Sequence, residues 1–289
     1  MPENTRTTPV CQHSLLTAVA PQHAVVDSGS SALRHGRSAR CCPERAERLT
    51  RLVHRDGPST GTCPSRDEHA PFPQPMNPGD AMPSYEAVIF DFGGVLTTNL
   101  DDCARAFARR TGLPDDAYLH AVTVNPVGRQ LFAQLERGDI TQEAWNAEIA
   151  QLLGIDGTDL MRRALTPLKP EAPMVEAARA IRAAGLRTAV LSNSMGMSPF
   201  NLYEPWKLED EHDVVVLSEQ VRMRKPDPEI YQLTLRQLGC RGPECIFVDD
   251  IEANLRPAQD LGITTIHAQQ PDQTLLRLGE LLGLPIAVL

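Results

Sequence analysis

The clearest pattern in the chain is a short apolar run, Ala87–Phe90, which ends abruptly at Asp91 and is followed by Gly93 and Gly94. An apolar run of this length, partly β-branched, is typical of a strand buried on both faces of a parallel sheet. The two glycines predict a tight turn directly after it. A carboxylate at the carboxyl end of such a strand lies where open α/β sheets bind their ligands.

The following segment, residues 100–168, has apolar residues at helical rather than strand spacing. Helices that end at or near a glycine are predicted over residues 104–112, 127–138 and 141–154. We therefore expect an all-helical insertion that covers the strand ends. Phe132 and Trp145 are expected to pack in the core of this insertion rather than to contact a substrate.

From residue 170 onward, helical and strand patterns alternate, which predicts parallel βαβ units. The predicted strands are residues 187–191, 214–217, 245–248 and 263–266, and the predicted helices are residues 174–184, 228–238, 252–261 and 273–282. The expected fold class is α/β: a Rossmann-like doubly wound parallel sheet with an inserted helical cap. The expected domains are a core of residues 83–99 and 169–289 and a cap of residues 100–168.

Residues 1–82 differ from the rest in composition. Residues 1–80 carry ten of the 24 prolines and few periodic apolar positions, so we expect a disordered extension. A zinc site is disfavoured, because the candidate ligands Cys41, Cys42, Cys63 and His54 lack the usual spacing. The change in composition also suggests that translation begins at Met76 or Met82.

Composition narrows the class of partner. A net charge of −9 and a pI near 5.4 argue against binding to nucleic acid or to an acidic membrane. No apolar run approaches the roughly 20 residues of a membrane helix, and no signal-peptide pattern is present. We therefore expect a cytoplasmic protein without a membrane partner. Seven cysteines without framework spacing indicate reduced thiols, and the oligomeric state is not predicted.

Polar clusters follow the later strands. They are Ser192-Asn193, Arg224-Lys225 and Asp249-Asp250. Each is weak evidence alone, but parallel strands bring their carboxyl ends to one edge of the sheet, so these side chains should meet Asp91 in one crevice. Carboxylates of Asp91 and Asp250 are ligands that Mg²⁺ accepts. Lys225 and the Ser192 hydroxyl could bind phosphate oxygens, with Asp91 placed for nucleophilic attack.

The segments FDFGGVLT, LSNS, KPDPEIY and FVDDIEAN, in this order, resemble the four motifs of the haloacid dehalogenase-like hydrolase superfamily. The resemblance covers about residues 84–289. The insertion resembles the helical cap of the branch that contains haloacid dehalogenases and the N-terminal phosphatase domain of soluble epoxide hydrolases, and the second half is especially similar to that domain. The resemblance implies an α/β hydrolase that uses a nucleophilic aspartate.

The resemblance also implies roles for individual residues. Asp91 would be the nucleophile and a Mg²⁺ ligand, Ser192 and the Asn193 backbone amide would bind the phosphoryl group, and Lys225 would neutralise charge. Asp250 would be a metal ligand, Asp249 a second ligand or the support of one, and Asn254 stands where many members have an acid. The backbone carbonyl of Gly93 would complete the metal site.

One departure concerns the general acid. Phosphatases of the family usually have a second aspartate two residues after the nucleophile, where this chain has Gly93. Glycine cannot protonate a leaving alkoxide, a contribution typically worth about 10²–10⁴-fold in rate. Thr97 and Thr98 are poor acids, and the spacing of His120 does not support it as a substitute.

We expect a Mg²⁺-dependent phosphatase that acts on a small phosphorylated metabolite through an aspartyl-phosphate. Two alternatives stay open: a 2-haloacid dehalogenase, which uses the same nucleophile and also lacks the second aspartate, and a non-catalytic binding or regulatory protein with this fold. The adjacent Asp249-Asp250 pair favours the metal-dependent hydrolase.

Overall fold

The computed structural model describes residues 84–286 and confirms the predicted α/β class. Five parallel strands form one sheet in the order β3–β2–β1–β4–β5. The strands are β1 (Ala87–Phe90), β2 (Arg187–Ser192), β3 (Val214–Leu217), β4 (Cys245–Asp249) and β5 (Thr264–His267). The expectations for residues 1–82, including disorder, zinc binding and an internal start, lie outside the described residues.

Helices cover both faces of the sheet. One face packs against α6 (Ala172–Ala183) and α11 (Pro271–Leu282), and the other against α9 (Pro228–Leu238) and α10 (Glu252–Asp260). Alternate residues of β1 point to opposite faces, so Val88 and Phe90 join the first core cluster while Ala87 and Ile89 join the second. All four are fully buried, which explains why this strand reads as a continuous apolar run.

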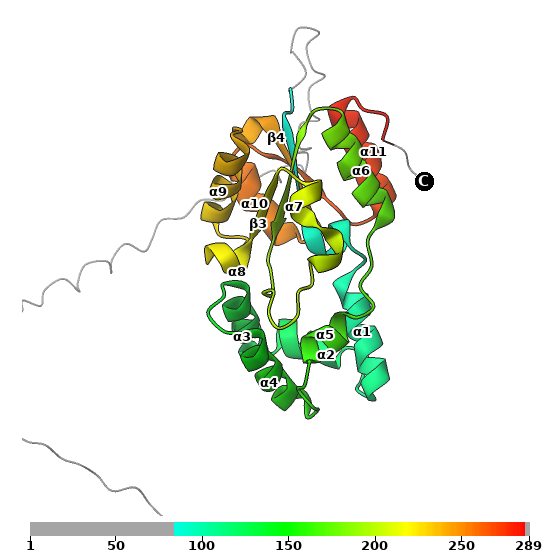
Figure 1. Ribbon diagram of the computed structural model, residues 1–289, viewed down its shortest axis with the longest axis vertical. Coiled ribbons are helices and arrows are strands. Elements are labelled where there is room, and N and C mark those ends of the chain that lie inside the picture. Colours follow the sequence, from blue (N-terminus) through cyan, green and yellow to red (C-terminus); the bar gives the residue numbers. More distant parts are fainter. Residues whose placement is uncertain (1–83, 287–289) are drawn as a thin grey trace, which may run out of the picture. The chain divides into compact units, whose positions relative to one another are not determined.

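The insertion between β1 and α6 is helical, as predicted. It contains α1 (Leu100–Thr111), α2 (Ala117–Leu119), a π-helical segment (His120–Val124), α3 (Pro126–Glu136), α4 (Gln142–Leu153) and α5 (Leu160–Leu165). Local sequence explains the ends of α1: the Asn99 side chain accepts from the Asp101 amide at 2.7 Å, and Gly112 ends the helix with φ 73°. Figure 1 shows these helices gathered at one end of the sheet.

Several details were not predicted. The short helices α5, α7 (Leu208–Glu211) and α8 (Ser218–Val221) are too brief for a periodic pattern to reveal them. Strands β2 and β4 each extend one residue further than predicted, to Ser192 and Asp249. Within residues 84–286 no helix combines the length and apolar character needed to cross a bilayer. The domain boundaries at residues 99/100 and 168/169 stay a prediction.

A buried histidine makes the stability of the fold depend on pH. His212, next to α7, is 7% exposed and packs with its ring 6.3 Å from that of Phe90. Burial lowers its pKa from 6.5 to about 4, so the imidazole is neutral in the folded chain and takes up a proton on unfolding below pH 6.5. The neutral imidazole contributes fully to the free energy of unfolding above pH 6.5, and this contribution is lost as the pH falls toward 4.

Between pH 7.5 and pH 5, we expect the free energy of unfolding to fall by roughly 2 kcal/mol less in His212→Gln than in the wild type. The reason is that glutamine does not titrate. Urea unfolding at the two pH values measures the difference. Equal losses in both proteins would show that the buried imidazole does not contribute.

Candidate active site

The register of the sheet places Asp91 at the centre of the strand ends. Phe90 pairs with Val190 of β2 and with Val248 of β4, so Asp91 leaves the sheet between the ends of these two strands. The backbone amide of Asp91 donates to the Val248 carbonyl at 2.8 Å. This hydrogen bond continues the pairing of β1 with β4 up to the carboxylate.

The turn after β1 brings the backbone against a second acid. Residues Phe92–Leu96 form a tight π-type turn in which Gly93 and Gly94 have non-helical dihedral angles. Gly94 has φ +75°, and a Cβ at this position would overlap the Asp250 carboxylate. Only glycine therefore lets the chain turn this close to Asp250.

Lys225 joins two of the acids. Its Nζ lies 2.8 Å from Asp91 Oδ1 and 2.7 Å from Asp249 Oδ2, and the residue is 1% exposed. Burial alone would lower the pKa of Lys225, but the two carboxylates outweigh burial and raise it. The side chain of Asn193 fixes the backbone of this lysine: its Nδ2 donates to the Lys225 carbonyl at 3.0 Å, and its Oδ1 accepts from the Lys225 amide at 2.8 Å.

The Asp249 carboxylate is held by donors from the protein itself. Besides Lys225, its carboxylate accepts from the Ile251 amide at 2.8 Å and from Asn254 Nδ2 at 3.0 and 3.1 Å. Both oxygens therefore have protein donors, and Asp249 is fully buried. Asn254, which stands where many family members have an acid, donates to this carboxylate in the structure.

The acids form a cluster that suits a divalent cation. One carboxylate oxygen from each of Asp91, Asp249 and Asp250 lies within 4.8 Å of the other two. Burial raises the pKa of Asp91 to about 8, with Lys225 lowering it and Asp249 adding to the rise. Burial, followed by the charge of Asp249, raises the pKa of Asp250 to about 6. One ammonium cannot balance three ionised carboxylates, so without a cation part of the cluster holds a proton near neutral pH.

Asp250 has the free oxygen that a metal site requires. Its Oδ1 is buried and has no hydrogen-bond partner among the described residues. A buried carboxylate oxygen without a partner costs about 1–3 kcal/mol or more, and Mg²⁺ takes one or two carboxylates with waters and phosphate oxygens as further ligands. Asp91 and Asp250 fit this ion.

Ser192 lies on the other side of Asp91. It is the last residue of β2, is 3% exposed, and its Oγ lies 3.1 Å from the hydroxyl of Tyr203. The Tyr203 ring packs on Phe92, with centroids 4.7 Å apart. Tyr203 carries no motif signal in the sequence, so its contact with Ser192 could be found only from the structure.

These residues line one cavity of about 490 Å³ at the strand ends. The cavity lining includes most of the predicted site residues: Asp91, Gly93, Ser192, Asn193, Lys225, Asp250 and Asn254. The fully buried Asp249 is not part of the lining. Phe132 and Trp145 also line it, so these two residues serve both the core of the insertion and the cavity wall. His120 is exposed and is not part of the lining.

No substitute for the missing aspartate is evident among the threonines. The Thr97 hydroxyl donates to the Thr98 carbonyl at 3.0 Å and accepts from the Gly94 amide at 3.2 Å. The Thr98 hydroxyl accepts from the Lys169 amide at 3.2 Å. The Thr97 hydroxyl therefore supports the turn after β1, and the Thr98 hydroxyl links the segment before the insertion to Lys169 after it.

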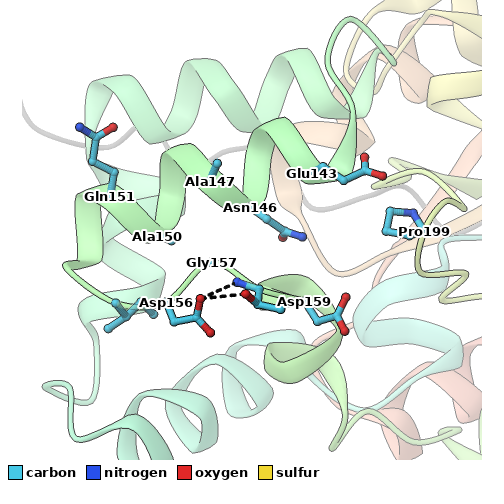
Figure 2. A pocket seen from close by; sticks show the side chains of 11 residues that line it. Glu143, Asn146, Ala147, Ala150, Gln151, Asp156, Gly157, Asp159 and Pro199 are labelled. Atoms are coloured by element: carbon cyan, nitrogen blue, oxygen red, sulfur yellow. Dashed lines mark hydrogen bonds between the residues drawn. The ribbon is translucent and has the colours of Figure 1, made fainter.

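A second hollow of about 550 Å³ lies elsewhere on the insertion, between α4 and the loop before α5 (Figure 2). Its lining residues include Glu143, Asp156 and Asp159, and it shares none of them with the cavity at the strand ends. Asp156 accepts from the Thr158 amide and hydroxyl, drawn as dashed lines in Figure 2. This hollow therefore contains none of the predicted site residues.

Comparison with known proteins finds a matching family model and several similar proteins. A family model described as haloacid dehalogenase-like hydrolase matches residues 85–262. The mouse (Mus musculus) acyl-CoA dehydrogenase family member 10 is 34% identical over 70% of this chain and 20% of its own length. A sesquiterpene phosphatase of Aspergillus oryzae is 27% identical over 69% of this chain and 98% of its own.

Mouse bifunctional epoxide hydrolase 2 is 30% identical over 67% of this chain, which spans 38% of that protein. Among solved structures, a variant of a HAD family enzyme from Bacteroides thetaiotaomicron, in complex with magnesium and inorganic phosphate, has a TM-score of 0.52. The two sequences are 22% identical, and the match covers 64% of this chain and 94% of the other. This likeness shows the fold.

We expect MgCl₂ to raise the melting temperature of protein stripped with EDTA, because a cation that binds only the folded chain stabilises it by mass action. Each kcal/mol corresponds to about 2–4 °C for a chain of this size. Asp250→Asn should remove most of the shift, which thermal scanning with and without Mg²⁺ measures. Asp260→Asn, an exposed acid on α10, is the matched control and should keep it. An equal shift in all three proteins would place the ion elsewhere.

Proposed function

The chain belongs to the haloacid dehalogenase-like hydrolase family, and we propose that it is a Mg²⁺-dependent phosphatase that hydrolyses a small phosphate monoester. The buried cluster supports this proposal above all: Lys225 lies between Asp91 and Asp249, next to an unpartnered oxygen of Asp250. The relative named as a sesquiterpene phosphatase, and the structural neighbour crystallised with magnesium and phosphate, point to the same chemistry.

In the proposed reaction Asp91 is the nucleophile. Its Oδ1 accepts from the Phe92 amide at 2.6 Å and from Lys225 at 2.8 Å, which leaves Oδ2 to attack phosphorus. The ester P–O bond breaks, the alcohol departs, and a phosphoryl group remains on Asp91. Water then attacks phosphorus, inorganic phosphate leaves and the carboxylate is restored.

The surrounding groups would hold the phosphoryl oxygens during both steps. The Ser192 hydroxyl and the Asn193 backbone amide donate to them, and the Lys225 ammonium balances their charge. A Mg²⁺ ion held by Asp91, Asp250 and the Gly93 carbonyl, with Asp249 supporting the site, would supply further positive charge next to the phosphoryl group.

The absence of a carboxyl side chain at Gly93 limits the range of leaving groups. A departing alkoxide must take its proton from water, so esters of weakly acidic alcohols should react slowly relative to aryl esters. The same glycine keeps two other functions open: dehalogenation of a 2-haloacid, and ligand binding without turnover. The Asp250 oxygen that has no partner within residues 84–286 favours the metal-dependent phosphatase over both.

We expect the wild type to hydrolyse p-nitrophenyl phosphate with Mg²⁺ and to lose this activity in EDTA. Asp91→Asn should reduce kcat by at least roughly 10³-fold, because the amide cannot attack phosphorus. Release of p-nitrophenol measures both effects. Absence of turnover with Mg²⁺ would falsify the proposal, and chloride release from 2-chloropropionate in EDTA would support the dehalogenase instead.

A second variant tests the role of Gly93. Its φ of −70° and ψ of 126° suit any residue, and an added Cβ would meet only the flexible tip of Leu100, at 2.7 Å. We expect Gly93→Asp, alone or with Leu100→Ala to make room, to raise kcat on alkyl phosphates more than on p-nitrophenyl phosphate, by about tenfold or more. A clear fall of activity on both esters, with Leu100→Ala alone as the control, would indicate that glycine serves another chemistry.

A further inference from the structure

The cavity above Asp91 is apolar at the end that the insertion and the loop after β2 provide. Its volume of about 490 Å³ lies in the range of small-molecule sites. The large apolar residues in its wall include Leu119, Val122, Phe132, Trp145, Leu165 and Leu202. Burying an organic group against this wall is favourable by about 25 cal/mol per Å² of apolar surface.

Few polar groups in this end of the cavity could bind hydroxyl groups of a substrate. The insertion contributes the hydroxyls of Tyr118 and Thr123 and the indole N–H of Trp145. Asn99, Asp101 and Glu136 also line the cavity. Of these, the Asn99 side chain already accepts from the Asp101 amide at 2.7 Å, and Glu136 pairs with Arg224. Thr123 already donates to the Leu119 carbonyl at 2.8 Å. A sugar phosphate buries several hydroxyls, and each one left without a partner costs about 1–3 kcal/mol. The cavity therefore suits an apolar alcohol better than a polyol.

The cationic side chains in the lining are both engaged within the chain. Lys225 contacts Asp91 and Asp249, as described above. Arg224 Nε lies 2.7 Å from Oε2 of Glu136 at the end of α3, and the two side chains are 28% and 5% exposed. The charge of Arg224 is thus balanced by a buried carboxylate before any substrate binds.

The Glu136–Arg224 pair lies where the cavity above Asp91 meets a neighbouring hollow. Both residues, with Val122, Thr123 and Phe132, also line a third hollow, of about 510 Å³, which is not the one in Figure 2. A substrate whose organic part extends away from the phosphate would pass this pair. A carboxylate or second phosphate on the substrate would meet Glu136 beside an arginine that is already paired.

This inference rests on the proposed function. We propose that the substrate is a monophosphate ester of an uncharged aliphatic or aromatic alcohol. Glu136, by pairing with Arg224, excludes substrates with a second anionic group. The helical insertion therefore determines specificity through its apolar wall and through one buried carboxylate.

The substrate class is tested by kcat/KM for n-decyl phosphate, glucose 6-phosphate and 3-phosphoglycerate in Mg²⁺, with p-nitrophenyl phosphate as the reference. The first three esters have similar primary alkyl leaving groups, so they differ in recognition rather than in leaving-group chemistry. We expect n-decyl phosphate to exceed both others by about tenfold or more, the effect of one or two unpaired polar groups.

The outcomes separate the two proposals. If p-nitrophenyl phosphate is not hydrolysed, the phosphatase function itself is wrong. If it is hydrolysed but glucose 6-phosphate or 3-phosphoglycerate equals n-decyl phosphate, only the inference about the substrate is overturned.

Substitutions of the ion pair test the role of Glu136. Glu136→Gln frees the guanidinium and should raise kcat/KM for 3-phosphoglycerate relative to n-decyl phosphate by about tenfold, through a lower KM. Arg224→Gln leaves the Glu136 carboxylate without its cationic partner. It should lower kcat/KM for 3-phosphoglycerate relative to n-decyl phosphate. Asp139→Asn, which removes an exposed acid that pairs with Arg137 and Arg222, is the charge-matched control. A ratio that does not respond to either substitution of the pair, or that responds equally to the control, contradicts the role of Glu136.

Discussion

The contact on which the site depends is the ammonium of Lys225 between the carboxylates of Asp91 and Asp249. Removing charges from water costs several kcal/mol per ion, and a buried group that loses its partner is strongly destabilising. The chain offsets this cost by placing the ammonium, from the loop before α9, in contact with one carboxylate just after β1 and another at the end of β4. The same contact aligns the proposed nucleophile, so stability and reactivity rest on one arrangement.

In the proposed reaction, the reacting groups and the groups that select the substrate come from different parts of the chain. The sheet supplies Asp91, Ser192 and Asp250, whose positions follow from strand register and from the turn at Gly94. The helical insertion supplies the apolar wall and Glu136. Because the proposed reacting groups and the proposed specificity residues lie on different elements, substitutions in the insertion would change the substrate without moving the reacting groups.

Local patterns in the sequence predicted the elements well where the signal was strong. The apolar run of β1, the glycine that ends α1 and the proline that begins α9 each report a local constraint on the backbone. The four-residue α7 and α8 were missed, because so few residues show no period. The roles of Tyr203 and Glu136 were missed for another reason: their partners, Ser192 and Arg224, are distant in sequence and no motif links them.

The sequence by itself determined the fold class and which polar residues end the strands, since strand burial and turns depend on neighbouring residues. Only the tertiary structure decided how these residues divide the work. Asp249 and Asn254 hold one another while Asp250 keeps a free oxygen, and the Asn193 side chain positions Lys225. Which carboxylate finds a donor depends on distances between segments far apart in the chain, and spacing along the sequence does not contain those distances.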